Sequence, residues 1–137
     1  MIVLDASIIL KLIFKEKGTP LALQLRENHI TGEEKIAAPE LLYYELANVL
    51  ATKVLISVKN ASSALSEIFN LEIETFTLGI EEFLASIGVS HKYTISVYDA
   101  SYVVLAERLN CNFVTADVKL FRKITDLKFV RLLGSTA

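Results

Sequence analysis

SVYDASYVVLAERLNCNFVTAD, residues 96–117, carries the clearest structural pattern in the sequence. It carries an acid near each end, Asp99 and Asp117, and is mostly apolar between them. The pattern predicts a buried helix over 97–109 and a short buried strand over 112–116. A helix that leads directly into a buried strand is the repeating unit of a parallel sheet. The acids at both junctions remain to be explained, because they could cap helices or gather around a metal ion.

The same alternation of strand-like and helix-like segments continues in both directions from this stretch. With five glycines and two prolines in 137 residues, the chain shows no linker, so we interpret it as a single domain, residues 1–137. The alternation predicts the α/β class, with three α/β/α layers around a mainly parallel sheet. The expected strands lie near residues 1–6, 35–38, 71–78, 112–116 and 128–133, and the expected helices near 7–16, 20–28, 39–55, 60–70, 80–89, 97–109 and 118–124.

Two helix starts are predicted from proline. Thr19 is expected to cap the second helix, with Pro20 in its first position. Pro39 is expected in the first turn of the long third helix.

Composition excludes several classes of protein. Although the chain is 53% hydrophobic, its most apolar window, residues 36–58, contains Glu40, Glu45 and Lys53, which oppose insertion into a bilayer. The N-terminal MIVLDAS lacks the basic region of a signal peptide, so no membrane partner is expected. The single cysteine, Cys111, excludes an internal disulfide and favours a cytoplasmic location. A net charge of −2 does not indicate a nucleic-acid binder, so any basic surface must be local.

The predicted topology places three of the acids at one edge of the sheet. Ligands of open parallel sheets bind just beyond the carboxyl ends of the strands. Asp5 ends the first strand, Asp117 ends a later one, and Asp99 opens a helix that should begin at the same edge. Taken singly, each has a structural explanation, since Asp99 and Asp117 suit helix caps and Asp5 suits a turn.

The long helix carries two glutamates in different settings. Glu40 lies in the first turn on a polar stripe, where the helix dipole explains it, so we interpret it as structural. Glu45 lies at the border of the apolar face, beside Asn48. A partly buried carboxylate needs a partner, either an arginine or a metal, and we interpret Glu45 as functional.

Convergence of these acids would have an electrostatic cost. Two like charges about 4 Å apart repel by about 4 kcal/mol at an effective dielectric constant near 20. A cation or bound protons must therefore neutralise them. Ligand sets made only of oxygen favour Mg²⁺ or Mn²⁺.

Four segments, VLDASIILKL (3–12), APELLYYELANVL (38–50), SVYDASYVVLAERL (96–109) and FVTAD (113–117), closely resemble PIN-domain ribonucleases, and especially VapC-type toxins of toxin–antitoxin pairs. The resemblance extends over residues 2–133. It implies an endoribonuclease that depends on Mg²⁺ or Mn²⁺ and has an acidic pocket at the carboxyl edge of a parallel sheet.

The resemblance also implies which residues form the site. By position, the acidic, hydroxyl and polar site residues of the family correspond to Asp5, Ser7, Glu45, Asn48, Asp99, Thr115 and Asp117. Asp5 and Asp99 are expected to hold the principal ion, with the other two acids completing its shell. The two hydroxyls are expected to orient ligands or the attacking water. Some relatives carry a further acid just beyond the last one, where this chain has Lys119. No histidine is required, and His29 and His91 are expected to be solvated.

Partners follow from the same resemblance. VapC-type proteins form homodimers and are silenced by a cognate antitoxin that fills a groove near the active site. The apolar helices over 20–28 and 39–55 are candidate surfaces for such contacts, or else part of the core. A local basic excess could contact RNA phosphates or form only a solvated face; it consists of Lys119, Arg122, Lys123, Lys128 and Arg131.

Two other classes of function remain open. One is a PIN-like module that binds RNA or protein without cutting, which the presence of all four acids disfavours. The other is a different metal-dependent α/β enzyme, such as a phosphatase or a phosphoacceptor domain. Against the phosphatase, Asp5 is followed by ASII, without a second acid two residues on.

Overall fold

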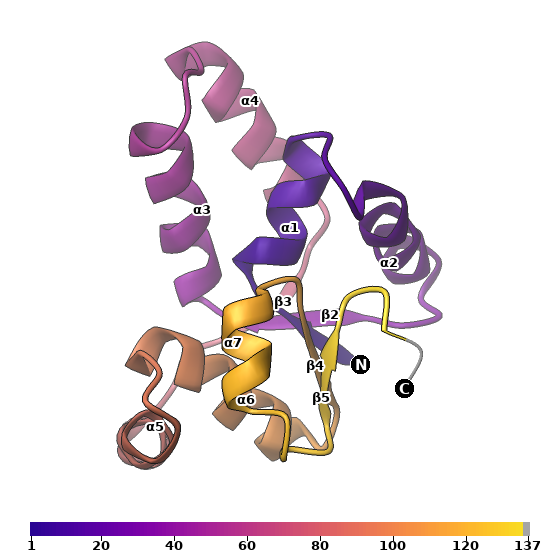
Figure 1. Cartoon of the computed structure of the whole chain (residues 1–137). Helices are drawn as coiled ribbons and strands as arrows, with labels where there is room; N and C mark the ends of the chain where they lie inside the picture. Colours follow the sequence, from indigo (N-terminus) through magenta and orange to yellow (C-terminus); the bar gives the residue numbers. More distant parts are fainter. Residues whose placement is uncertain (136–137) are drawn as a thin grey trace.

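A five-stranded parallel sheet forms the centre of the molecule in the computed structural model, which describes residues 1–135 (Figure 1). Its strands lie in the order β3-β2-β1-β4-β5, and every neighbouring pair is parallel. The predicted parallel α/β sheet is therefore confirmed. The strands are β1 (Ile2–Leu4), β2 (Ile36–Pro39), β3 (Glu74–Phe76), β4 (Asn112–Thr115) and β5 (Val130–Leu132).

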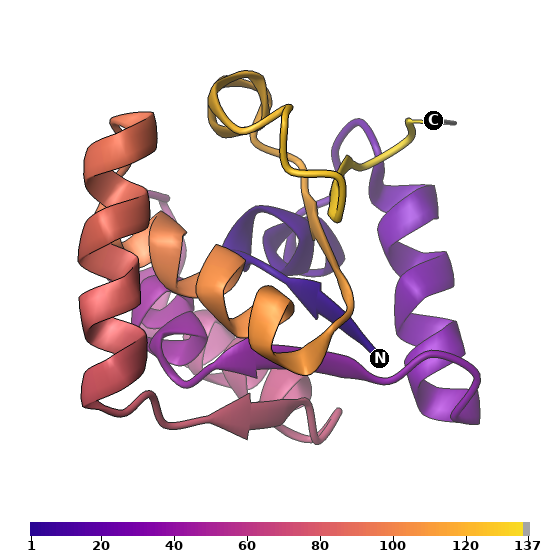
Figure 2. The ribbon, with the colours of Figure 1, turned by 90° about the horizontal axis from the view of Figure 1, so that it is seen from below.

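Helices cover both faces of the sheet and complete three α/β/α layers. The helices α1 to α4 lie on one side of it, whereas α6 packs against β1, β2 and β4 from the other side, with α5 packed on α6 (Figures 1 and 2). The helices are α1 (Ala6–Ile13), α2 (Thr19–Thr31), α3 (Leu41–Thr52), α4 (Val58–Phe69), α5 (Ile80–Tyr93), α6 (Val97–Leu109) and α7 (Val118–Lys123).

Burial explains the apolar composition. Every residue of β1 and β2 is buried, as expected for strands covered on both faces. Helix α6 is buried continuously from Ala100 to Ala106, because it lies between the sheet and α5. Within residues 1–135, no helix has the length and apolar character needed to cross a membrane.

The starts of two helices differ from the prediction. Gly18, not Thr19, precedes α2, and its φ of 91° is in the left-handed region that glycine adopts without steric cost. The Thr19 hydroxyl instead donates to the carbonyl of Lys11 and accepts from the amide of Glu16. Pro39 ends β2 rather than opening α3. Proline fits at this end of β2 because its partner in β3, Phe76, accepts from the amide of Glu40, and because β1 pairs with β2 only at Ile36 and Ala37.

His29 was expected to be solvated, and this prediction is wrong. The side chain is 2% exposed on α2, with its Nδ1 accepting from the amide of Ile36 at 2.9 Å. Its Nε2 therefore carries the proton and donates to the carbonyl of Leu71 at 2.6 Å. Polar neighbours in the sequence do not show which side of a helix faces inward. His91, by contrast, is exposed on α5, as expected.

Candidate active site

The predicted acids lie at or beside the carboxyl edge of the sheet. Asp5 directly follows β1, and Asp117 lies two residues beyond the neighbouring strand β4. Asp99, in the first turn of α6, lines the same hollow as Asp117. Glu45, in the second turn of α3, is close enough for its charge to act on Asp5. Segments far apart in the chain therefore bring the four carboxylates into one electrostatic neighbourhood.

Asp5 is the most fully constrained of these acids. Its Oδ1 accepts from the amide of Ser7 at 3.1 Å and from the Ser7 hydroxyl at 2.5 Å, and its Oδ2 accepts from the Thr115 hydroxyl at 2.6 Å. The Ser7 hydroxyl in turn accepts from the amide of Ala116 at 2.8 Å. Both predicted hydroxyls thus fix the Asp5 carboxylate, which also caps α1.

The charge of Asp5 is opposed by its surroundings. Burial raises the pKa of this carboxyl to about 6; the hydrogen bonds from Ser7 and Thr115 act against that rise, and the charges of Asp99 and Glu45 add to it. Asp5 is only 6% exposed, so water does little to screen this repulsion. A cation beside Asp5 would offset both the cost of burying its charge and the repulsion from Asp99 and Glu45.

The hydrogen-bond partner of Glu45 is a tyrosine rather than the arginine considered from the sequence. The hydroxyl of Tyr102, on α6, donates to Glu45 Oε1 at 2.5 Å. Burial raises the pKa of Glu45, the Tyr102 hydrogen bond lowers it, and the charge of Asp99 raises it. Burial and the charge of Glu45 also raise the pKa of Tyr102 above its ordinary value, so the phenol stays protonated. Sequence reasoning missed Tyr102, although it stands three residues after Asp99 on the same face of its helix.

Helix capping explains part of the role of Asp117, whereas Asp99 takes part in a cap only through its backbone amide. Ser96 caps α6 by accepting from the amide of Asp99 at 3.0 Å. Asp117 caps α7 by accepting from the amide of Leu120 at 3.0 Å. Burial, followed by the charge of Asp117, raises the pKa of Asp99, while Ser96 and then Lys123 lower it. Capping does not exclude metal binding, because a carboxylate has further lone pairs to offer.

A small polar hollow of about 170 Å³ lies beside these two acids. Lys119 and Lys123 of α7 line it together with Asp99 and Asp117. Lys123 also donates to the carbonyl of Thr94 at 3.0 Å. Two members of the predicted basic group therefore lie next to the acids. Arg131, another member, hydrogen-bonds the carbonyls of Lys128 and Val130.

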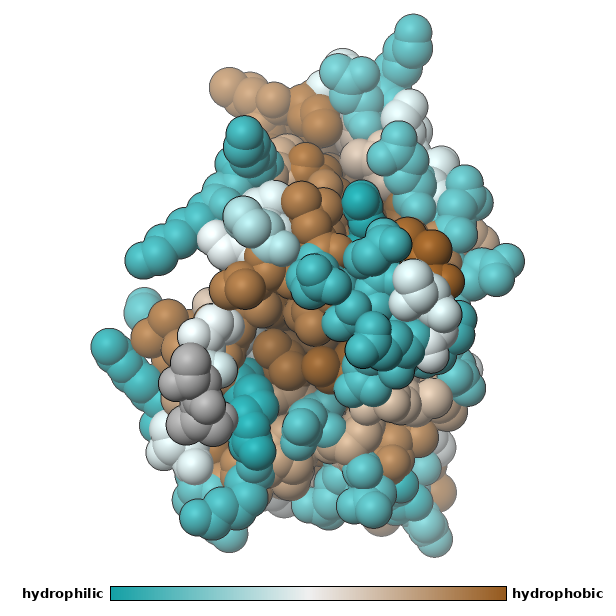
Figure 3. All heavy atoms as spheres, turned by 90° about the vertical axis from the view of Figure 1, so that its right-hand side faces the viewer, coloured by the Kyte–Doolittle hydropathy of each residue, from teal (hydrophilic) through white to brown (hydrophobic). Residues whose placement is uncertain are grey.

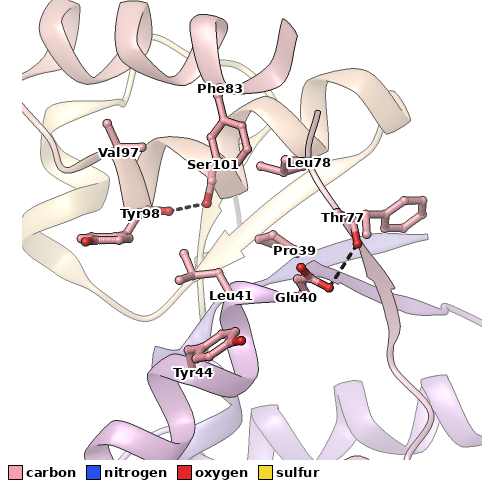
Figure 4. A pocket seen from close by; sticks show the side chains of 11 residues that line it. Pro39, Glu40, Leu41, Tyr44, Thr77, Leu78, Phe83, Val97, Tyr98 and Ser101 are labelled. Carbon is pink, nitrogen blue, oxygen red and sulfur yellow. Dashed lines mark hydrogen bonds between the residues drawn. The ribbon is translucent and has the colours of Figure 1, made fainter. Parts of the chain in front are cut away.

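A larger pocket of about 350 Å³ is mainly apolar, and none of the four acids lines it (Figure 4). Phe83 reaches into it from α5, and Tyr44 and Tyr98 line it as the chain neighbours of Glu45 and Asp99. Glu40, on its wall, accepts from the Thr77 hydroxyl at 3.1 Å, in agreement with its structural interpretation. Such a lining suits apolar side chains better than a charged phosphate.

The donor set of the site fits a divalent cation. Within residues 1–135, no three Asp, Glu, His or Cys side chains already lie at the spacing of a formed metal site. Asp5 is nevertheless buried and Glu45 and Asp99 are half-buried, and their charges repel one another, whereas Asp117 is exposed. Mg²⁺ is usually bound directly by one or two carboxylates and reaches other groups through water, so this spacing is compatible with it. Asn48 is exposed on α3, one turn beyond Glu45.

Comparisons with known proteins give a consistent result. The family model described as PIN domain matches residues 2–127. Ribonuclease VapC3 of Pyrobaculum aerophilum is 29% identical over an alignment of 133 residues, which covers 92% of this chain and 96% of the relative. Ribonuclease VapC9 of Mycobacterium tuberculosis is 32% identical over an alignment of 124 residues, which covers 88% of each protein. A solved toxin–antitoxin complex from Klebsiella pneumoniae contains a chain that is similar in fold, with a TM-score of 0.70, 14% identity and 96% coverage of both chains.

Proposed function

Because this chain belongs to the PIN domain family and is a VapC-type endoribonuclease, we propose that it hydrolyses RNA at the four-carboxylate site with Mg²⁺ or Mn²⁺. The observation that carries this proposal is the buried Asp5, held through both oxygens beside the charges of Asp99 and Glu45. We also take residues 1–137 as a single domain and the cytoplasm as its location.

The roles of the residues follow from their contacts. Asp5 and Asp99 would hold the principal ion, and Glu45 and Asp117 would complete its shell directly or through water. Ser7 and Thr115 orient the Asp5 carboxylate through their hydroxyls. A divalent cation bound here would lower the pKa of a water and neutralise charge on the phosphoryl oxygens.

The RNA backbone is attracted to the same place by α7. Lys119 and Lys123 line the hollow beside Asp99 and Asp117, so a phosphate there meets positive charge. Arg131, by contrast, hydrogen-bonds backbone carbonyls. We therefore assign phosphate contact to these two lysines.

A cognate antitoxin is the protein partner that the VapC-type relatives imply. A groove of about 310 Å³ between α3 and α4 is lined mainly by small and aliphatic side chains, among them Leu50, Ala61 and Leu65. We propose that the antitoxin fills this groove, which agrees with the candidate surface predicted on helix 39–55. The other predicted surface, α2, exposes Leu21, Leu23 and Ile30, and it lies on the side of the molecule shown in Figure 3, where apolar and polar surface are interspersed.

A homodimer is proposed through α5, which was not among the predicted surfaces. Its outward stripe of Ile80, Phe83, Leu84 and Ile87 has the helical spacing i, i+3, i+4, i+7, and each of these side chains is about half exposed or more. Acidic residues occupy the first turn of α5 and basic residues its last turn. A second copy packed antiparallel would therefore meet opposite charges at both ends.

The test of the catalytic proposal is RNA cleavage by the purified protein in Mn²⁺ or Mg²⁺, with EDTA and the Asp99→Asn variant alongside. Cleavage should stop with EDTA and fall by at least a hundredfold in Asp99→Asn, because the cation loses a ligand. Glu40→Gln is the matched control, since it removes a carboxylate from the same sheet edge outside the site, and it should retain activity. Persistent cleavage in EDTA or in Asp99→Asn would contradict the metal–carboxylate mechanism. Absence of cleavage by the wild-type protein on a broad set of RNAs would favour the binding-module alternative.

A further inference from the structure

Glu45 depends on a single neighbour for its position. Within residues 1–135, the hydroxyl of Tyr102 is the only side-chain group that hydrogen-bonds this carboxylate, at 2.5 Å from Oε1. The two residues are 57 positions apart and belong to different helices, α3 and α6. The contact therefore fixes one helix relative to the other at the site.

The ring of Tyr102 is buried and packs against the sheet. The side chain is 1% exposed, and its ring stacks on Phe113 of β4 with centroids 5.8 Å apart. The ring alone would fill this part of the core, and phenylalanine would do so equally well. A buried hydroxyl, however, costs free energy unless it has a partner. The hydroxyl thus has a role separate from packing.

The chemistry of the donor points to that role. An arginine beside Glu45 would neutralise the carboxylate and compete with a metal cation. A phenol is neutral, so it orients the carboxylate while leaving its negative charge available. It also engages only one of the two oxygens, Oε1. The charge of Glu45 remains close enough to act on Asp5, and the charge of Asp99 acts on Glu45.

We propose that Tyr102 is a positioning residue of the active site, whose hydroxyl fixes Glu45 so that its second oxygen serves the cation centre near Asp5 and Asp99. This inference rests on the proposed metal-dependent function. Groups that hydrogen-bond metal ligands typically contribute 10–100-fold to metal affinity or activity. Tyr102 acts through Glu45 and does not itself touch the RNA.

The test is the Tyr102→Phe variant, which removes one oxygen atom and keeps the ring. Mn²⁺ affinity, measured by calorimetry on the whole protein, should fall about tenfold, and the Mn²⁺ concentration for half-maximal RNA cleavage should rise accordingly. The melting temperature without metal should stay within a few degrees of wild type, because the packing against Phe113 is retained. Tyr43→Phe, a change at a half-buried tyrosine on α3, is the matched control and should leave Mn²⁺ affinity unchanged.

A double-mutant cycle with Glu45→Gln separates positioning from packing. If Tyr102 acts through Glu45, the Tyr102→Phe change should cause little further loss of Mn²⁺ affinity in the Glu45→Gln background. An equal loss in both backgrounds, or wild-type affinity in Tyr102→Phe, would overturn the inference while leaving the proposed function intact. Failure of the wild-type protein to bind Mn²⁺ would overturn both, so the two failures are distinguishable.

Discussion

Asp5 shows how one residue can combine strong hydrogen bonding with an unfavourable charge. Burial raises its pKa from 3.8 to about 6, so the folded protein binds this proton more tightly than the unfolded chain does. The stabilisation is fully present below about pH 4 and is lost as the pH rises through 6. A pKa difference of 1 corresponds to about 1.4 kcal/mol, so the rise from 3.8 to about 6 makes the lost free energy of unfolding about 3 kcal/mol.

The Asp5→Asn variant tests this linkage. Without metal, the free energy of unfolding of the wild-type protein should fall between pH 4.5 and 7.5, whereas that of the variant should fall less steeply. Denaturant unfolding in EDTA across this range measures both. Added Mn²⁺ should stabilise the wild-type protein more at pH 7.5 than at pH 5, because metal binding requires the ionised carboxylate. Equal slopes for the two proteins in EDTA would show that Asp5 does not carry the effect.

Among the elements, α6 follows its sequence signals closely, and α2 does not. The predicted range 97–109 for α6 is confirmed, because Ser96 caps its start and Asn110 ends it in the left-handed conformation that asparagine tolerates. Helix α2 has no clear apolar side, so the sequence does not reveal that His29 faces inward. The histidine joins the end of α2 to the start of β2 and to the segment before β3.

The role of His29 as a link between elements predicts a stability defect. His29→Leu fills the site with an apolar side chain of similar size but leaves the amide of Ile36 and the carbonyl of Leu71 without this partner. Each unpaired buried group costs about 1–3 kcal/mol, so the free energy of unfolding should fall by about 3 kcal/mol. Chemical denaturation measures the change. His91→Leu, at an exposed position on α5, is the control and should stay close to wild type; a similar loss in both variants would refute the explanation.

For the whole molecule, the exposed stripe of α5 predicts self-association. Leu84→Glu places a charge in the middle of the stripe, where burial against a second copy would be costly. Light scattering coupled to size exclusion should show a dimer for the wild-type protein at micromolar concentration and a monomer for the variant. Val58→Glu alters an exposed apolar residue on α4, outside the stripe, and should leave the dimer intact. A wild-type monomer, or a dimer that persists in Leu84→Glu, would rule out this interface.

The sequence by itself determined the alternation of elements, and through it the parallel sheet and the placing of Asp5 and Asp117 beyond neighbouring strands. These features depend on local periodicity and on which residues follow a strand, and both can be read directly from the sequence. It did not determine where Pro39 would fall, because that depends on the pairing of β2 with β3, which extends to Pro39 opposite Phe76. The tertiary structure alone decided that Tyr102 holds Glu45 and that His29 is buried. Both contacts join residues on different elements, so they exist only once the helices have packed on the sheet and on one another.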